Sequence, residues 1–192
     1  MFYLVWARGR FDEGIAVSTR AVEYDPLSGY ANAIIAFCYG HAGNGSEAVQ
    51  AGKSAIELEE SFFTYWALQH AYHSDRKFEK GVAAGEMALA VSGRHPFAMS
   101  AQAMIFADWG KTAEAKAIYA ELVARATGRY IQPSHLAIAA SAAGEHEKAV
   151  AHGLEAFEIR DPMLMLARYW SHFARLRKDP RFMQILSSVG LQ

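Results

Sequence analysis

Small side chains recur along the chain at nearly constant intervals. The first series follows a turn residue by five positions and consists of Gly14, Ala48, Gly81, Ala115 and Ala149. The second series lies seven positions further on and consists of Ala21, Ala55, Ala88 and Ala156, with the larger Leu122 at this position in the fourth copy. A spacing of seven places both members on one face of a helix, so each segment shows a small-residue face to a neighbouring helix.

Turn residues divide this pattern into short helical segments. Gly9, Gly43, Gly110 and Gly144 occupy the turn position, and Arg76 takes the same place in the middle copy. Proline stops the segments that end at Asp25 and Asp161, because it disfavours helix in the residue before it. The pattern predicts helices over residues 12–24, 29–42, 46–59, 62–74, 78–91, 96–109, 112–126, 133–143, 146–159 and 181–189, after the end of a first helix over 1–8.

The interval, about 34 residues, is that of the tetratricopeptide repeat, a helix–turn–helix unit that stacks on copies of itself. The eighth repeat position holds Ala36, Gln69, Ala103 and Ala137, and the eleventh holds Tyr39, Tyr72, Phe106 and Ala140. Over residues 1–160 the sequence therefore resembles the tetratricopeptide family. The resemblance implies an all-α fold, a right-handed α-α superhelix of about five repeats with a C-terminal capping helix.

The resemblance also predicts how the chain is divided. We expect one solenoid domain over 1–192, with repeats at 1–28 (truncated), 29–61, 62–95, 96–129 and 130–162 and a cap at 163–192. Counting back from Gly9, Met1 falls at the seventh position of its repeat. The apolar residues 2–6 are therefore expected to form an uncovered seam. The chain would then be a fragment of a longer protein or would bury this end in a dimer; a naturally short first helix is the alternative.

The C-terminal stretch from Tyr130 carries a second resemblance. Leu176-Arg-Lys-Asp-Pro-Arg-Phe182, followed by Gly190-Leu191, is similar to the end of tetratricopeptide regions in bacterial multidomain regulators, which carry an adenylate cyclase, a winged-helix domain or a kinase in front. Residues 160–192 hold six basic and two acidic residues. We expect this positive tail to contact the acidic body of the chain rather than DNA, because aromatic positions for base stacking are not regularly interleaved.

Composition narrows the function classes. Hydrophobic residues make up 52 % of the 192 and the net charge is −1, which gives no electrostatic reason to expect a nucleic acid or an anionic membrane as partner. The single cysteine, Cys38, excludes an internal disulfide framework. No apolar run approaches the roughly 20 residues of a membrane-spanning helix. We expect a cytoplasmic protein.

Motifs for chemistry are weak. Gly52-Lys53-Ser54 resembles the end of a phosphate-binding loop, but it lies inside a predicted helix and lacks the preceding glycine. His70 and His73 share one helix face, and His41 of the preceding repeat could approach them, which leaves a loosely held zinc as a minor alternative. We expect no cofactor and no enzymatic activity.

The family resemblance assigns repeat positions two, five, six, nine, twelve and thirteen to a concave groove. These positions contain no Lys or Arg, so the carboxylate clamp that binds chaperone tails in this family is missing. An apolar, aromatic groove suits an amphipathic helix or an extended apolar peptide. The candidate contact residues are Tyr30, Ile34, Phe37, His41, Phe63, Trp66, His70, His73, Phe97, Met104 and Asp108.

The sequence therefore predicts a non-catalytic protein-interaction scaffold, the C-terminal regulatory module of a larger bacterial signalling or transcription protein. Three alternatives stay open at this stage. The chain could be a homodimeric scaffold that uses its N-terminal helix and groove. It could be a metal-dependent enzyme that uses the groove histidines. The groove could also be filled by its own side chains or by the C-terminal helix.

Overall fold

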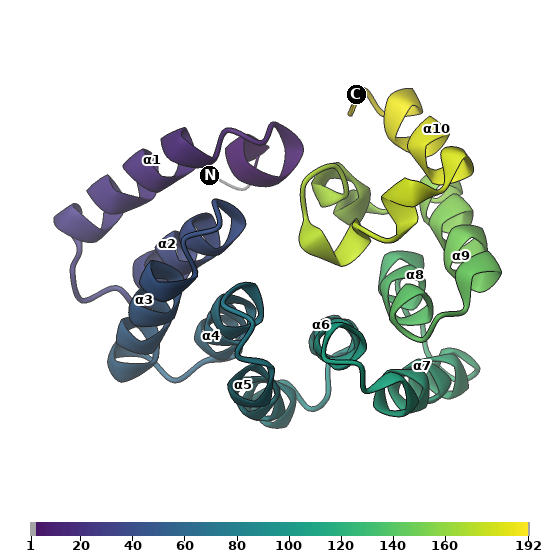
Figure 1. Cartoon of the computed structure of the whole chain (residues 1–192), viewed down its shortest axis with the longest axis horizontal. Helices are drawn as coiled ribbons and strands as arrows, with labels where there is room; N and C mark the ends of the chain where they lie inside the picture. Colours follow the sequence, from purple (N-terminus) through teal and green to yellow (C-terminus); the bar gives the residue numbers. More distant parts are fainter. Residues whose placement is uncertain (1–2, 192) are drawn as a thin grey trace. The chain divides into compact units, whose positions relative to one another are not determined.

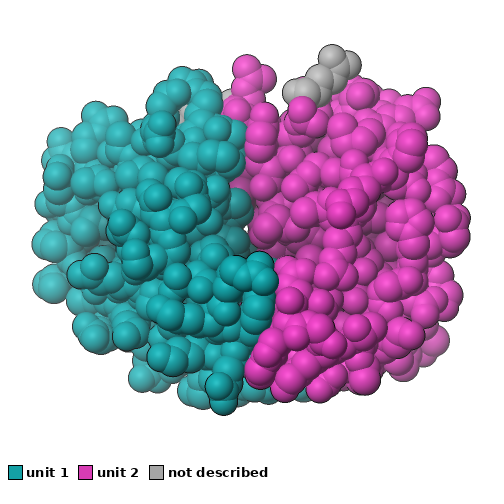
Figure 2. All heavy atoms as spheres, viewed as in Figure 1, with its two compact units in different colours: residues 1–5, 9–94 teal, residues 6–8, 95–192 magenta. Residues whose placement is uncertain are grey.

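The computed structural model describes residues 3–191, with side chains from Val5 onward, and contains helices and no strand in that range. The prediction for Phe2 therefore lies outside the described residues. The chain forms two compact units, residues 1–5 with 9–94 and residues 6–8 with 95–192 (Figure 2). The single domain expected over 1–192 stays a prediction, and each unit is described by itself.

Unit 1 consists of helix pairs. A π-helical turn begins at Tyr3 and ends at Ala7, and its last two residues belong to unit 2. Unit 1 then contains α1 (Phe11–Tyr24), α2 (Gly29–His41), α3 (Gly45–Leu58), α4 (Phe62–Ser74) and α5 (Phe78–Val91). Helix α2 packs against α3 and α4 against α5, and α2 and α4 lie next to each other (Figure 1).

Unit 2 repeats this arrangement and adds a cap. It contains α6 (Pro96–Asp108), α7 (Thr112–Ala126), α8 (Pro133–Ala142) and α9 (His146–Glu158). Three short 3₁₀ turns follow at Pro162–Leu166, Ser171–Phe173 and Leu176–Lys178, and then α10 (Pro180–Ser188). Helix α6 packs against α7 and α8 against α9, α6 and α8 lie next to each other, and α10 packs on α9.

The first helix of each pair is the buried one. Buried residues follow one another without a break from Ala31 to Cys38 in α2, from Thr64 to Tyr72 in α4 and from Ala98 to Ile105 in α6. Helix α3, in contrast, buries only Ala48, Val49, Gly52 and Ala55 along one stripe. A helix that is apolar all round must be covered on all sides, whereas an amphipathic helix can face solvent, and this difference orders the layers of each unit.

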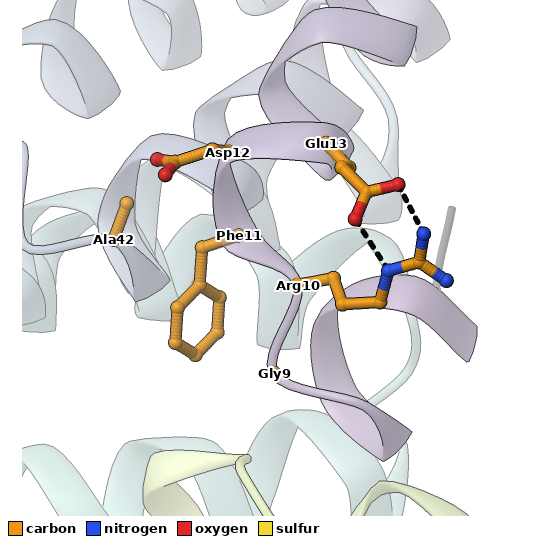
Figure 3. A pocket seen from close by; sticks show the side chains of 6 residues that line it. All are labelled: Gly9, Arg10, Phe11, Asp12, Glu13 and Ala42. Carbon is orange, nitrogen blue, oxygen red and sulfur yellow. Dashed lines mark hydrogen bonds and ion pairs between the residues drawn. The ribbon is translucent and has the colours of Figure 1, made fainter.

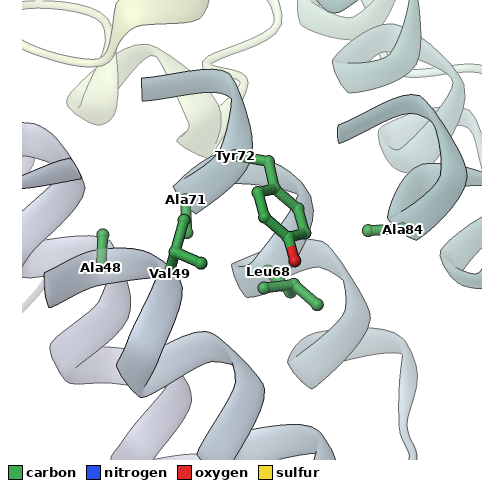
Figure 4. Close-up of a cluster of buried hydrophobic side chains, with 6 residues drawn as sticks. All are labelled: Ala48, Val49, Leu68, Ala71, Tyr72 and Ala84. Carbon is green, nitrogen blue, oxygen red and sulfur yellow. The ribbon is translucent and has the colours of Figure 1, made fainter. Parts of the chain in front are cut away.

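The recurring small residues lie where helices meet. Ala48 on α3 and Ala71 on α4 are fully buried in a cluster with Val49, Leu68 and Tyr72 (Figure 4). The added Cβ of an alanine at Gly52 would lie 3.1 Å from Leu68, so the glycine permits this close approach of α3 to α4. Ala48 belongs to the predicted small-residue frame, so this member of the frame lies in a contact between helices.

Left-handed turn residues separate the helices of a pair. Gly43 has φ +86° after α2, and Arg76 has φ +57° at the equivalent place after α4. Glycine reaches this region without a steric penalty, whereas a residue with a Cβ is strained there. The tight turn therefore forms in the middle copy although its favoured residue is missing, and the packed helices on either side hold it.

The helices predicted from residue 12 onward are confirmed to within one residue at each end, whereas the end of a helix predicted over 1–8 is a π-helical turn over Tyr3–Ala7 in the described residues. The N-terminal seam differs from the expectation. Val5, Trp6 and Ala7 are buried rather than uncovered. Val5 packs on Gly14 in unit 1, and Trp6 lies against Trp170 in unit 2 with ring centroids 5.9 Å apart. Because the π-helical turn is short, it does not cover the far end of α1, and Ala21 is exposed where its repeat equivalents are buried.

The Asp179–Pro180 pair anchors the cap. Asp179 begins α10 by accepting from the backbone N–H of Arg181, and it also lies 2.9 Å from Nε2 of His146 on α9. The Arg181 guanidinium donates two 3.0 Å bonds to Glu147. Hydrogen bonds from Arg181 and His146 hold the pKa of the Asp179 carboxyl below its usual range. The expected contact between the basic tail and acidic residues of the body is thus present within unit 2, between Arg181 and Glu147.

Cys38 is fully buried on α2, 3.3 Å from the hydroxyl of Ser18 on α1. Burial raises the pKa of its thiol. The residue fills a small space between two helices, as a small apolar side chain would.

We expect Gly14→Ala to destabilise the protein by about 1–3 kcal/mol, because its Cβ would lie 2.4 Å from a methyl group of Val5. Val5→Ala in the same chain should recover part of the loss. Chemical denaturation measures both, and Gly128→Ala is the control, since its added Cβ would meet no other described residue within 4 Å. Equal stability of Gly14→Ala and wild type would contradict this packing.

Candidate functional site

Helices α2 and α4 bring together most of the aromatic residues that the sequence assigns to a groove. The ring of Tyr30 stacks on that of Phe63 with centroids 4.8 Å apart. Phe37 lies 5.5 Å from Phe63 and 4.2 Å from Trp66, again between ring centroids. Aromatic pairs at such separations stabilise one another beyond the apolar area that they bury. We refer to the α2–α4 aromatic surface, which consists of Tyr30, Ile34, Phe37, His41, Phe63, Trp66, His70 and His73.

This surface has a buried floor and an accessible rim. Phe37 and Trp66 are 0 % and 5 % exposed, and Ile34 and His70 are also buried. Tyr30 is 54 % exposed, and Phe63 is partly exposed. Phe37 and Trp66, which the sequence suggests as binding hot spots, therefore support the rim from below, and a partner would meet Tyr30 and Phe63 first.

Two histidines continue the surface toward the C-terminal end of α2. The rings of His41 and His70 are stacked with centroids 4.4 Å apart, and Nδ1 of His41 lies 3.1 Å from Nε2 of His70. Nδ1 of His41 also lies 2.8 Å from the carbonyl oxygen of Phe37, which can only accept, so neutral His41 carries its proton on Nδ1. Burial lowers the pKa of His41 to about 4, so this histidine is uncharged at neutral pH.

A pocket of about 350 Å³ opens beside this end of α2 (Figure 3). The residues that line it are Gly9, Arg10, Phe11, Asp12, Glu13 and Ala42. The Phe11 ring lies 6.5 Å from that of His41. Arg10 forms an ion pair with Glu13, whereas the Asp12 carboxylate points away from Arg10 (Figure 3). Within the part of the chain that the structure describes, Asp12 has no hydrogen-bond or ion-pair partner. The pocket thus offers a carboxylate to a cation.

The three groove histidines do not form a metal site in the structure. His41 and His70 are in contact, but His73 lies against Phe78, with ring centroids 6.2 Å apart. Among residues 3–191, no group of three or more His, Cys, Asp or Glu side chains could hold a metal ion. The zinc alternative that the sequence left open therefore finds no ligand set there.

The equivalent surface of unit 2 carries the C-terminal segment of the chain. Trp170, 1 % exposed, stacks on Phe97 of α6 with ring centroids 5.6 Å apart. His135 of α8 meets the same Phe97 ring edge-on at 5.4 Å. Phe97 therefore lies between α8 and the cap, and this part of the predicted groove is filled by the chain's own residues.

The other two candidates in unit 2 are covered as well. Met104 is 2 % exposed. Asp108, at the end of α6, accepts from the guanidinium of Arg175 at 2.7 Å. Of the eleven predicted contact residues, these two and Phe97 thus contact or lie beneath the protein's own side chains, while eight gather on the α2–α4 aromatic surface. Partner binding by any of them stays a prediction.

Sequence reasoning missed Phe11, Asp12, Trp170 and Arg175. The first two lie on the second helix of their repeat, after its groove positions, so repeat register gave no reason to include them. The aromatic run Tyr169–Phe173 was a signal for the other two, since an apolar aromatic segment outside the repeat pattern must find a surface to cover.

Similarity to known proteins comes from structure alone. No protein-family model matches the chain, and no curated protein sequence matches it either. The crystal structure of a thermophilic TPR protein of Thermus thermophilus is similar, with a TM-score of 0.66 and 20 % identity over 90 % of this chain and 95 % of that one. This chain has the tetratricopeptide-repeat fold. The all-α solenoid expected from the sequence is thus confirmed.

A second solved structure shares the fold. It is the Naa15/Naa10 complex bound to HypK-THB, in which one chain matches with a TM-score of 0.53 and 18 % identity. The match covers 97 % of the present chain and 30 % of that chain. No helix within residues 3–191 is long and apolar enough to cross a membrane.

We expect Trp170→Ala to destabilise unit 2 by about 3–5 kcal/mol, because it empties a fully packed site on Phe97. Hydrogen exchange should show faster exchange across Pro162–Lys178. The neighbouring Tyr169→Ala is the matched control, since Tyr169 is 36 % exposed. Equal effects of the two substitutions would argue against the stacking of Trp170 as the anchor of the cap.

We expect stability to fall as the pH is lowered from about 6.5 to about 4, in part through His135. Burial lowers the pKa of His135 to about 4 from 6.5, against the attraction of Asp161 and with the repulsion of His95. Between these values the unfolded chain binds the proton more tightly, so one site contributes a slope of up to about 1.4 kcal/mol per pH unit. Denaturation of His135→Asn should show a shallower pH dependence over that window. An unchanged slope would contradict the assignment.

Proposed function

We propose that this chain is a non-catalytic protein-interaction scaffold that binds a partner helix or extended peptide on the α2–α4 aromatic surface. The observation that carries the proposal is the stacked pair of Tyr30 and Phe63 above a floor of Phe37 and Trp66. Exposed aromatic rings on a rigid, buried support are typical binding hot spots, because little conformational entropy is lost when a partner covers them.

The groove positions lack lysine and arginine, so the partner is held mainly by apolar and aromatic contact. The two contact modes differ in shape, a helix presenting residues at spacings of three and four and an extended peptide presenting alternate residues. The rim formed by Tyr30 and Phe63 is accessible or partly accessible, so either mode can reach it.

We further propose that the chain acts as the C-terminal regulatory module of a larger bacterial signalling or transcription protein in the cytoplasm. The resemblance of Leu176–Phe182 and Gly190-Leu191 to the ends of such regulators supports this context. The homodimer alternative has less support, because Val5, Trp6 and Ala7 are buried and offer a second copy no surface.

Site-specific photo-crosslinking tests the binding surface. With benzoylphenylalanine in place of Tyr30, we expect a protein partner to be covalently trapped in a native extract. The matched control replaces Tyr24, which is 91 % exposed in the same unit but outside the surface, and it should trap little. Equal trapping at both positions, or none at Tyr30, would remove the α2–α4 aromatic surface as the binding site.

A further inference from the structure

Helix α6 in unit 2 shows what kind of peptide segment the first helix of a repeat can accept. Trp170 stacks on Phe97 near the start of α6, and Arg175 pairs with Asp108 at its end. Between them the chain is irregular, with Trp170 itself extended and Ser171–Phe173 forming a 3₁₀ turn. Trp170 and Arg175, five positions apart in the segment, thus contact Phe97 and Asp108, which are eleven positions apart on α6. Eleven residues of α-helix span about 16 Å.

Unit 1 offers the equivalent ring site, and none of its described residues covers that site as Trp170 covers Phe97. Phe63 lies one repeat before Phe97, and Tyr30 lies one repeat before Phe63, so the three rings occupy the same repeat position. Tyr30 and Phe63 stack on one another, and Tyr30 is 54 % exposed. An incoming indole or phenyl ring could therefore stack at this end of α2 as Trp170 does on Phe97.

The other end of α2 offers the equivalent cation site. His41 occupies the repeat position of Asp108, eleven positions after Tyr30, and it is neutral because burial lowers its pKa to about 4. The carboxylate is supplied instead by Asp12, in the pocket that Phe11 and Ala42 line beside His41 (Figure 3). A ring site at one end of α2 and a carboxylate at the other are thus both present, although the acidic residue comes from α1.

The overall charge of unit 1 favours the same kind of partner. Its residues 1–5 and 9–94 contain eleven acidic and seven basic side chains, a net charge of −4. The segment that fills the inner surface of unit 2 has the opposite character, because residues 168–178 contain four basic and no acidic residues. Opposite charges steer a partner toward its site and select against acidic competitors.

We propose that the α2–α4 aromatic surface binds a basic, aromatic peptide segment of a separate protein, with a tryptophan or phenylalanine on Tyr30 and Phe63 and an arginine five positions later at Asp12. The proposal rests on the function proposed above and names the chemistry of its partner. A basic partner also agrees with the lack of the carboxylate clamp, whose Lys and Arg would bind an acidic chaperone tail.

A labelled peptide that copies residues 167–178 tests this chemistry with the full chain in fluorescence anisotropy. We expect saturable binding that weakens as salt is raised. Replacing the tryptophan of the peptide by alanine should weaken binding about tenfold or more, and replacing the arginine five positions later by glutamate should weaken it by about fivefold. Equal binding of an acidic peptide of the same length would overturn the proposal.

Variants of the protein locate the site. We expect Phe63→Ala combined with Tyr30→Ala to abolish binding, and Asp12→Asn to weaken it about two- to fivefold while reducing its salt dependence. Glu57→Gln, an exposed carboxylate on α3, is the matched control for charge, and Tyr24→Ala is the control for an exposed ring. Circular dichroism confirms that each variant is folded. If Asp108→Asn alone weakens binding, the peptide occupies α6 instead and the proposal is wrong.

Two further measurements distinguish a second copy of the chain from a separate protein, and the binding surface from the chemistry of its peptide. Concentration-dependent dimers in light scattering that Tyr30→Ala abolishes would show that a second copy supplies the segment, which would overturn the separate partner. A partner trapped at position 30 together with no binding of the basic peptide would overturn the chemistry alone. Failure of both experiments would remove the binding surface itself.

Discussion

The fold depends on one constraint, which is that the first helix of each pair must be covered over most of its surface. Helices such as α2 and α4 are buried over most of their circumference, so they are stable only where neighbouring helices approach closely. Small residues at Gly14, Gly52 and Ala48 permit this approach, because a larger side chain would separate the backbones. The turns, the layers and the position of the aromatic surface follow from that packing.

The same constraint explains how much the sequence could predict. The period of small residues locates every α-helix of the repeats, including α5, which follows a turn with Arg76 rather than glycine. Repeat register also selects the residues that face the inner side, such as Phe37 and Trp66. It does not tell how deeply each lies, because depth depends on rings from two helices that stack on one another, as Tyr30 and Phe63 do.

Contacts outside the repeat were beyond the reach of periodicity. Arg175 pairs with Asp108 across 67 residues of sequence, and Trp170 covers Phe97 from an irregular segment with no period of its own. Such pairings depend on shape and charge in three dimensions. From the sequence, only the general tendency of a basic tail to contact acidic residues could be predicted. The pocket that contains Asp12 could not be predicted for the same reason, because residues at the start of α1 and Ala42 after α2 form it together.

The burial of Cys38 has a practical consequence. It is the one cysteine of the sequence, it is fully buried, and the raised pKa of its thiol favours the protonated form, which reacts slowly with alkylating reagents. A cysteine introduced at an exposed position such as Tyr24 or Val91 would therefore be modified selectively while the native thiol stays intact. The wild-type background is thus suited to spin labels or fluorophore pairs that report distances within either unit of the native protein.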